Sequence, residues 1–322
     1  MTSINFSLAC IGGSHSSKLL EDRIIDATRL GSRKTPFGVS QPIYVCRNSA
    51  GRFYLLLRHS DGKLPLASSF ANHRANIFAL KELGVTHIVS INSARAVSHN
   101  YRVGQFVLTD DLIDETKHRI GTFFENGLRI ELRQWPVFCP TLRSGLATVL
   151  QQTGVKFSDH GTYLCSEGPR RETCAEVRKY ALWGADLLGH SLAPEAFLAK
   201  ELQLCYASLC IINDFAETGS IHRPYEAESL FQNITPAKED QKGRDPQLQM
   251  PGILQMLISI LPQIKTQCSC QTNLDHLIEA GLLSKDFHDW FPKTKADDDK
   301  KIMPIPLQLP PSGRTSDKNI KV

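Results

Sequence analysis

The chain has 322 residues, 41% of them hydrophobic and 22% charged, which is typical of globular proteins and excludes a fully disordered or fibrous chain. The 37 Lys and Arg against 33 Asp and Glu give a net charge of +4, too small to indicate a nucleic-acid or membrane partner. Nine scattered cysteines argue against a disulfide framework and favour a reducing compartment. No apolar run reaches the roughly 18 residues of a membrane span and no signal peptide is evident, so we expect a cytoplasmic protein.

Short apolar runs alternate with helical patterns along most of the chain, which predicts an α/β fold. We expect a single domain over residues 1–285 with a central mixed sheet flanked by helices, a polar surface loop at 236–249, and a disordered Pro-rich tail over 286–322. Strands are expected at 4–11, 42–47, 52–58, 86–91, 106–110, 161–168, 185–191 and 204–212. Helices are expected at 70–83, 141–152, 172–181, after Pro194, at 253–261 and at 274–283.

Small, basic and acidic side chains follow five of the expected strands. A Gly-Gly-Ser turn at 12–14 offers N–H groups to an anion, and Arg58-His59 could bind a phosphate. Ser90–Ala94, Glu167–Arg170 and 213–215 end three further strands. Each has an ordinary explanation as a turn, a solvated arginine or a salt bridge. Because ligands of α/β sheets gather at the carboxyl ends of strands, their common position indicates a phosphate site.

Asp214 follows a long apolar run and precedes Phe215. A carboxyl group at the end of a buried strand can have a raised pKa and act as a general acid. Alternatively, Asp214 is a turn residue or a helix N-cap.

Cys268 and Cys270 are the only closely spaced cysteines. Because no second pair of this kind is present in the sequence, a zinc site is not expected, and two free thiols or a strained disulfide remain. We expect no metal and no organic cofactor.

Several longer motifs carry a resemblance. Residues 5–285 resemble the S-methyl-5'-thioadenosine phosphorylase and purine nucleoside phosphorylase family of the trimeric type. The matching segments are IGGS (11–14), TPFGVSQPI (35–43), RH (58–59), ANHRANIFALKELGVTHIV (71–89), DDLIDET (110–116), FCP (138–140), SEGPR (166–170) and WGADLLGHSLAPEAFLAKELQLCYASL (183–209). The resemblance implies a homotrimer with active sites near subunit interfaces. It also implies attack of inorganic phosphate on C1' of a purine nucleoside while the base leaves.

The resemblance assigns roles residue by residue. It places phosphate on Ser14, Arg58, His59, Asn92, Ser93 and Ser191. Asp214 matches the carboxylate that bonds the purine near N7, which makes it the expected catalytic acid. The nucleoside is expected to contact Arg95, Arg171, His190, Asn213 and Phe215.

The base and sugar positions depart from the family pattern. Arg95 replaces a glycine, Arg171 a base-stacking aromatic residue and His190 a methionine under the ribose. Ala216 replaces the carboxylate that recognises a 6-amino group, and Glu131 falls near the histidine that a neighbouring subunit places over the 5' substituent. We therefore expect altered base or 5' specificity. The alternatives are a homologue without turnover that binds a nucleoside or anion, and a biosynthetic transferase or hydrolase of an unusual nucleoside.

Overall fold

The computed structural model describes residues 6–13, 16–59, 66–98, 100–125, 128–217 and 246–291. The chain divides into a compact unit, Met1–Phe291, and a second unit, Pro292–Val322, of which no residue is among those described. No helix in the described ranges is long and apolar enough to cross a membrane.

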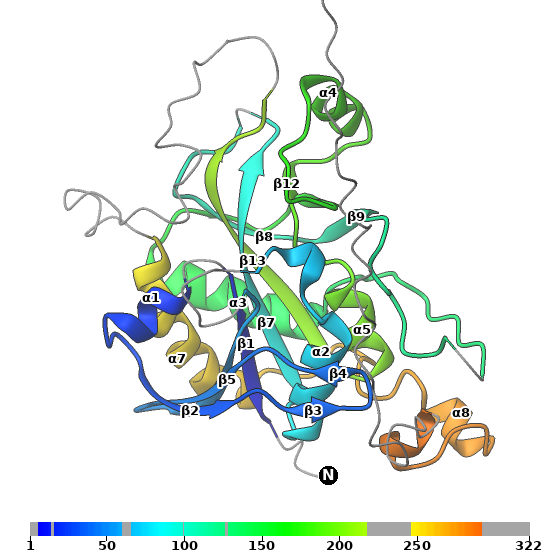
Figure 1. The fold of residues 1–322 in the computed structure, drawn as a ribbon. Helices are drawn as coiled ribbons and strands as arrows, with labels where there is room; N and C mark the ends of the chain where they lie inside the picture. Colours follow the sequence, from blue (N-terminus) through cyan, green and yellow to red (C-terminus); the bar gives the residue numbers. More distant parts are fainter. Residues whose placement is uncertain are drawn as a thin grey trace, which may run out of the picture. The chain divides into compact units, whose positions relative to one another are not determined.

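A large mixed sheet forms the centre of the compact unit (Figure 1). Its strand order is β10-β8-β13-β7-β1-β6-β5-β2, and β9, β11 and β12 extend it beyond the end of β7. The strands are β1 (Leu8–Gly12), β2 (Asp26–Gly31), β5 (Ile43–Asn48), β6 (Gly51–Leu57), β7 (His87–Ala96), β8 (Phe106–Leu108), β9 (Asp111–Glu115), β10 (Phe157–Ser158), β11 (Thr162–Ser166), β12 (Leu187–Gly189) and β13 (Cys205–Phe215). The short strands β3 (Lys34–Thr35) and β4 (Gly38–Val39) pair separately.

Helices cover both faces of the sheet (Figure 1). They are α1 (Ser16–Glu21), α2 (His73–Glu82), α3 (Pro140–Thr153), α4 (Cys174–Leu182), α5 (Glu195–Glu201), α7 (Met250–Ile260) and α8 (Asp275–Glu279). Side chains of β1 alternate between two cores: Ala9 and Ile11 pack in the core with α2 and α5, whereas Leu8 and Cys10 pack in the core with α3 and α7. This alternation is the two-residue period of a strand buried on both faces. The fold class predicted from the sequence is confirmed.

Local sequence signals set the ends of several helices. Asn72 caps α2 by accepting a hydrogen bond from the backbone N–H of Ala75. Thr173 and Glu176 form a reciprocal capping box at the start of α4, and Gly154 ends α3 in the left-handed conformation. The expected helix at 172–181 therefore begins later, which leaves Glu172 outside the helix, where its carboxylate is available to the loops.

The compact unit continues to Phe291, beyond the domain boundary expected at residue 285. Residues Phe287–Trp290 form the 3-10 helix η5, and Trp290 and Phe291 are buried in the core that contains α2. Phe291 packs edge-on against Phe37 and Phe78. Aromatic burial therefore extends the packed chain to residue 291, and the expectation for 292–322 lies outside the described residues.

Candidate active site

Four adjacent parallel strands bring Gly13, Arg58 and Asn92 to one edge of the sheet. Gly12 of β1 is in register with Leu57 of β6, and β1 and β13 both run parallel to β7. The backbone of Gly13 closes on its neighbours: a Cβ there would lie 3.1 Å from Ile91 O and 3.9 Å from Arg58 Nη1. The carbonyl oxygen of Ile91 would therefore crowd a side chain at Gly13, whereas the distance to Arg58 is ordinary van der Waals contact. Ser14 lies outside the described residues.

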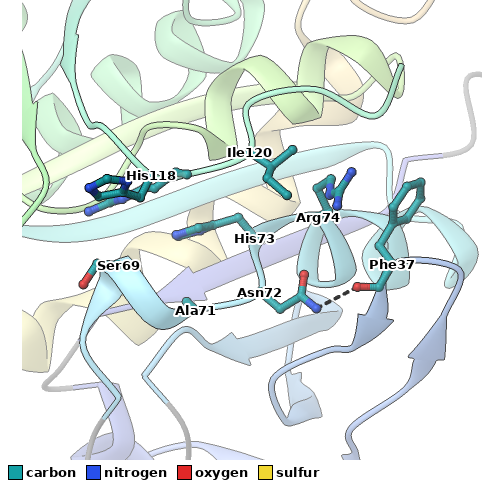
Figure 2. A pocket seen from close by; sticks show the side chains of 9 residues that line it. Phe37, Ser69, Ala71, Asn72, His73, Arg74, His118 and Ile120 are labelled. Carbon is teal, nitrogen blue, oxygen red and sulfur yellow. Dashed lines mark hydrogen bonds between the residues drawn. The ribbon is translucent and has the colours of Figure 1, made fainter. Parts of the chain in front are cut away.

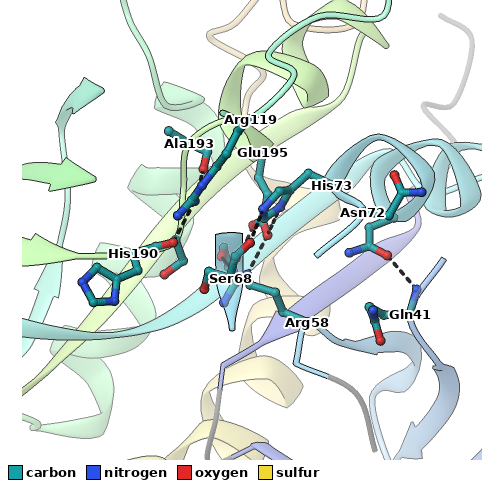
Figure 3. A network of polar contacts seen from close by, with 12 residues as sticks. Gln41, Arg58, Ser68, Asn72, His73, Arg119, His190, Ala193 and Glu195 are labelled. Atoms are coloured by element: carbon teal, nitrogen blue, oxygen red, sulfur yellow. Dashed lines mark hydrogen bonds and ion pairs between the residues drawn. The ribbon is translucent and has the colours of Figure 1, made fainter. Parts of the chain in front are cut away.

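Arg58 is held in place by a buried carboxylate. Its Nε and Nη2 donate to the two carboxylate oxygens of Glu195 at 2.6 and 2.9 Å, and Nη2 also donates to Ser90 Oγ at 2.6 Å (Figure 3). Tyr206 Oη donates to Glu195 Oε2 at 2.9 Å, and His73 Nδ1 lies 3.3 Å from Glu195 Oε1. Arg58 and Glu195 are 1% and 0% exposed, so this pair is a fixed part of the interior.

The two charges stabilise each other against burial. Burial disfavours the charged form of Glu195, but Arg58 and His73 outweigh it and hold the pKa of Glu195 well below its usual range. Burial likewise disfavours the charge on Arg58, but Glu195 raises the pKa of Arg58 above its ordinary value. Both groups are therefore ionised at neutral pH.

His59 follows Arg58 and is neutral at pH 7. Burial, with the neighbouring charge of Arg58, lowers the pKa of His59 to about 4. Its Nδ1 lies 2.7 Å from the carbonyl oxygen of Leu66, which requires the proton of the neutral ring to be on Nδ1.

The other residues that are predicted to bind phosphate lie at two separate places, on β7 and after β12. Asn92 is buried, and its Nδ2 donates to Ser90 O and Ser208 Oγ at 3.0 and 3.1 Å, which connects Asn92 to the Arg58 network through Ser90. Ser93, the next residue of β7, is half-buried and in register with Ile211. Ser191 lies after β12 instead, where its Oγ is 3.3 Å from Tyr163 Oη.

Two of the residues that are predicted to contact the nucleoside, Arg95 and His190, are joined through Glu172. Arg95 Nη2 donates to Glu172 Oε2 at 2.5 Å, and His190 Nε2 lies 3.3 Å from Glu172 Oε1 and 3.4 Å from Arg95 Nη2. Ser166 Oγ donates to Glu172 Oε1 at 2.5 Å. Burial disfavours the charge on Glu172, but His190, Arg95 and Ser166 lower its pKa to about 2. Sequence reasoning missed Glu172 because it expected a helix there.

Asp214 is neither a turn residue nor an N-cap. It lies within β13 beyond a register shift, beside Arg95 of β7. Its Oδ2 accepts a hydrogen bond from Arg171 Nη1 at 3.3 Å. Asn213, at the shift, is exposed, and Phe215 is half-buried against the core.

Arg119 organises the loops around these residues, although sequence reasoning did not find it. Its Nη1 donates to His190 O and Ala193 O at 2.8 and 2.7 Å, and its Nη2 donates to Glu167 O at 2.8 Å (Figure 3). A second partner of Nη2 is the carbonyl oxygen of Ser166 at 3.3 Å. The acceptors named so far are backbone atoms, which a side-chain pattern does not reveal. Arg119 Nε also pairs with Glu167 Oε1 at 3.4 Å, across 48 positions of the sequence.

Comparisons with known proteins identify the family. The family model described as the phosphorylase superfamily matches residues 31–235. The chain belongs to this superfamily. It is 32% identical to the S-methyl-5'-thioadenosine phosphorylase of Hyperthermus butylicus, over 85% of this chain and 96% of that protein. It is 30% identical to the 6-oxopurine nucleoside phosphorylase of Pyrococcus furiosus, over 83% and 97%. The crystal structure of a methylthioadenosine phosphorylase from an antarctic soil metagenomic library aligns with a TM-score of 0.71 at 28% identity, covering 85% of this chain and 92% of that one.

The family resemblance suggested by the sequence motifs is thereby confirmed. In this member of the phosphorylase superfamily, a pocket of about 280 Å³ lies beside the Arg58 network (Figure 2). Its lining residues are Phe37, Ser69, the segment 71–74 at the start of α2, and the segment 118–120. His73 belongs to both the pocket and the Arg58 network, and Arg119 belongs to both the pocket and the loops around His190, so the pocket adjoins both groups. Glu131, by contrast, is exposed and paired with Arg129.

A group of thiols is located at the other end of β13. The sulfur atoms of Cys139, Cys205, Cys268 and Cys270 lie within 4.8 Å of one another. Among the described residues these are the side chains grouped closely enough to hold a metal ion.

Proposed function

We propose that the protein is a pentosyltransferase that cleaves a purine nucleoside with inorganic phosphate. Phosphate oxygen forms a bond to C1', the N-glycosidic bond breaks, and the products are the free base and a ribose-1-phosphate derivative. The observation that carries this proposal is Arg58, fixed by Glu195 and Ser90 against the Gly13 turn. A rigid guanidinium at the carboxyl ends of parallel strands is suited to bind phosphate. The similarity to nucleoside phosphorylases supports the same reaction.

The phosphate would be bound from several sides. We assign it to Arg58, the backbone N–H groups of the Gly-Gly turn, and the side chains of Ser14, His59, Asn92, Ser93 and Ser191. Holding the phosphate below C1' in this way supplies proximity and orientation, which the reaction needs because the transition state resembles an oxocarbenium ion. The reaction requires no further cofactor in this proposal.

Asp214 would protonate the leaving base. Its Oδ2 accepts a hydrogen bond from Arg171 Nη1, so a bound base must displace Arg171 to reach that oxygen. The planar guanidinium of Arg171 can itself stack on a purine ring. Because Ala216 offers no second carboxylate, we propose that selectivity for a 6-amino group is weakened and that the base or 5' specificity has shifted.

A homologue without turnover remains the second candidate, because ion pairs occupy the nucleoside region. Arg95 with Glu172 and Arg171 with Asp214 already satisfy each other's charges. A nucleoside must compete with these contacts, whereas an anionic ligand could use the two arginines directly.

We also propose a homotrimer located in the cytoplasm. In this assembly a neighbouring subunit would complete the 5' end of the nucleoside site, in keeping with the resemblance to the trimeric family. Sedimentation of the purified protein tests this proposal, and a monomer at micromolar concentration would contradict it.

Chromatography of released base tests the reaction. The protein is incubated with methylthioadenosine, methylthioinosine, adenosine, inosine and guanosine, each with and without phosphate. We expect base release from at least one nucleoside only when phosphate is present, and its loss in Asp214→Asn. Release without phosphate would indicate a hydrolase. Binding of a nucleoside without release would favour the second candidate.

A further inference from the structure

Four cysteines that are distant in the sequence converge at the amino end of β13. Cys205 begins β13, and Cys139 caps the start of α3. Cys268 and Cys270 lie in the segment between α7 and α8. All four are free thiols, and their sulfur atoms lie within 4.8 Å of one another. Only one closely spaced pair, Cys268 and Cys270, is visible in the sequence, and the fold supplies Cys139 and Cys205 from separate parts of the chain.

The spacing of the sulfur atoms fits one tetrahedral metal ion. Zinc–sulfur bonds of about 2.3 Å at tetrahedral angles place the sulfur atoms about 3.8 Å apart. The Sγ atoms of Cys205 and Cys268 are 3.8 Å apart. Two disulfides would instead need two close sulfur pairs, not four mutually close atoms. Four sulfur ligands in this geometry are typical of a structural zinc ion.

The surroundings can stabilise thiolates. Cys139 is at the N-terminus of a helix of 14 residues, where the helix dipole favours negative charge. The backbone N–H of Leu142 donates to Cys139 Sγ at 3.4 Å, and Gln271 Nε2 donates to Cys205 Sγ at 3.8 Å. Such N–H donors to ligand sulfur are the outer contacts expected around a zinc–thiolate site.

We propose that Cys139, Cys205, Cys268 and Cys270 bind one structural zinc ion. Each thiol gives up its proton to solvent and each sulfur forms one bond to Zn²⁺, which leaves no position for a substrate. Cys205 is nine residues from Asp214 along β13, or about 30 Å at roughly 3.3 Å per residue. The ion would therefore not take part in the reaction. It would fix the segment after α7 to the ends of α3 and β13.

Elemental analysis and mass spectrometry of the protein, purified without added reductant, test the site. We expect one zinc per chain, four sulfur neighbours in zinc X-ray absorption, and zinc release when a mercurial reagent modifies the thiols. Cobalt(II) added to zinc-depleted protein should give the visible absorption of tetrahedral cobalt thiolate. Zinc at trace levels only, iron in its place, or a mass lower by the four hydrogens of two disulfides would overturn the proposal.

Variants locate the metal. The double variant Cys268→Ser, Cys270→Ser changes the two half-buried ligands and should bind less than a tenth of the zinc, with a lower Tm. Cys174→Ser is the matched control, because Cys174 is also half-buried but lies in α4, outside the cluster. The control should keep the full zinc content. Unchanged zinc in the double variant would contradict the assignment, whether or not stability changes.

Discussion

Arg171 Nη1 lies 3.3 Å from Asp214 Oδ2, and the two side chains are 35% and 34% exposed. The expected catalytic acid is therefore paired with a residue that replaces the base-stacking aromatic side chain of the family pattern. At this exposure, the pair contributes little to stability, but it occupies the oxygen of Asp214 to which we propose the purine binds. Activity and not folding should respond when the pair is broken.

We predict that Arg171→Phe increases kcat/KM for methylthioadenosine at least several-fold. The aromatic ring can stack on the purine, and Asp214 Oδ2 loses the hydrogen bond from Arg171 that competes with the base. Steady-state base release measures the effect.

The adjacent Arg170 provides the control. It is exposed and pairs with Glu176 at 2.6 Å, so Arg170→Ala should leave kcat/KM unchanged. An equal response of both variants, or no response to Arg171→Phe, would place Arg171 outside the base pocket.

The sequence predicted the sheet, most helices and the edge at which Arg58 and Asn92 meet. These features follow from local patterns, because apolar runs and the polar residues after them mark the strands and their ends. It also predicted Asp214 near Arg95 and Arg171, although only through the resemblance.

The partners of these residues could not be predicted in the same way. Glu195 and Arg58 are 137 positions apart in the sequence. Glu172 was expected to be a residue of a helix, whereas α4 begins at Cys174. The four thiols come from three separate elements. Each arrangement depends on tertiary packing, which a motif along one chain does not encode.

We predict that Glu195→Gln lowers the free energy of unfolding by about 3 kcal/mol, because it leaves the buried charge of Arg58 without its counterion. Phosphate, which can supply that negative charge, should raise the Tm of the variant more than that of the wild type. Thermal unfolding with and without phosphate measures both effects.

Glu176→Gln is the control for this experiment, since its partner Arg170 is exposed. It should unfold as the wild type does, with the same phosphate response. Equal phosphate stabilisation in Glu195→Gln and the wild type would show that phosphate does not reach Arg58.

The pKa of His59 predicts a dependence of stability on pH. Its folded pKa is about 4 against the ordinary 6.5, so below pH 6.5 the unfolded chain binds a proton that the folded chain does not. The contribution to stability is present above pH 6.5 and falls by up to about 1.4 kcal/mol per pH unit towards pH 4. Urea unfolding of His59→Asn at pH 7, 6 and 5 should show a shallower loss than the wild type.

His160 serves as the control, because its hydrogen bond to Asp159 raises its pKa in the folded protein. Its contribution to stability is therefore present at low pH and is lost as the pH rises, which is opposite to His59. His160→Gln should not make the loss of stability below pH 6.5 shallower. A wild-type slope in His59→Asn would mean that folding does not lower the pKa of His59.

Gly189 ends β12 immediately before His190 and Ser191, and its contact with Tyr163 predicts a sensitive position. A Cβ at Gly189 would lie 1.9 Å from Tyr163 Oη and 2.7 Å from its Cζ. Tyr163 is fully buried, so its ring cannot move aside without disturbing the core.

We predict that Gly189→Ala costs about 3 kcal/mol or more of stability, since the overpacked ring must shift. Tyr163 Oη also contacts Ser191 Oγ at 3.3 Å, so surviving enzyme should show a raised KM for phosphate. Gly252→Ala is the control: apart from its chain neighbours and the backbone of α7 itself, no atom lies within 4 Å of its Cβ position, and it should gain about 0.5 kcal/mol. Thermal unfolding and phosphate titration measure both variants. If Gly189→Ala folds normally but keeps the wild-type KM, Ser191 does not bind phosphate.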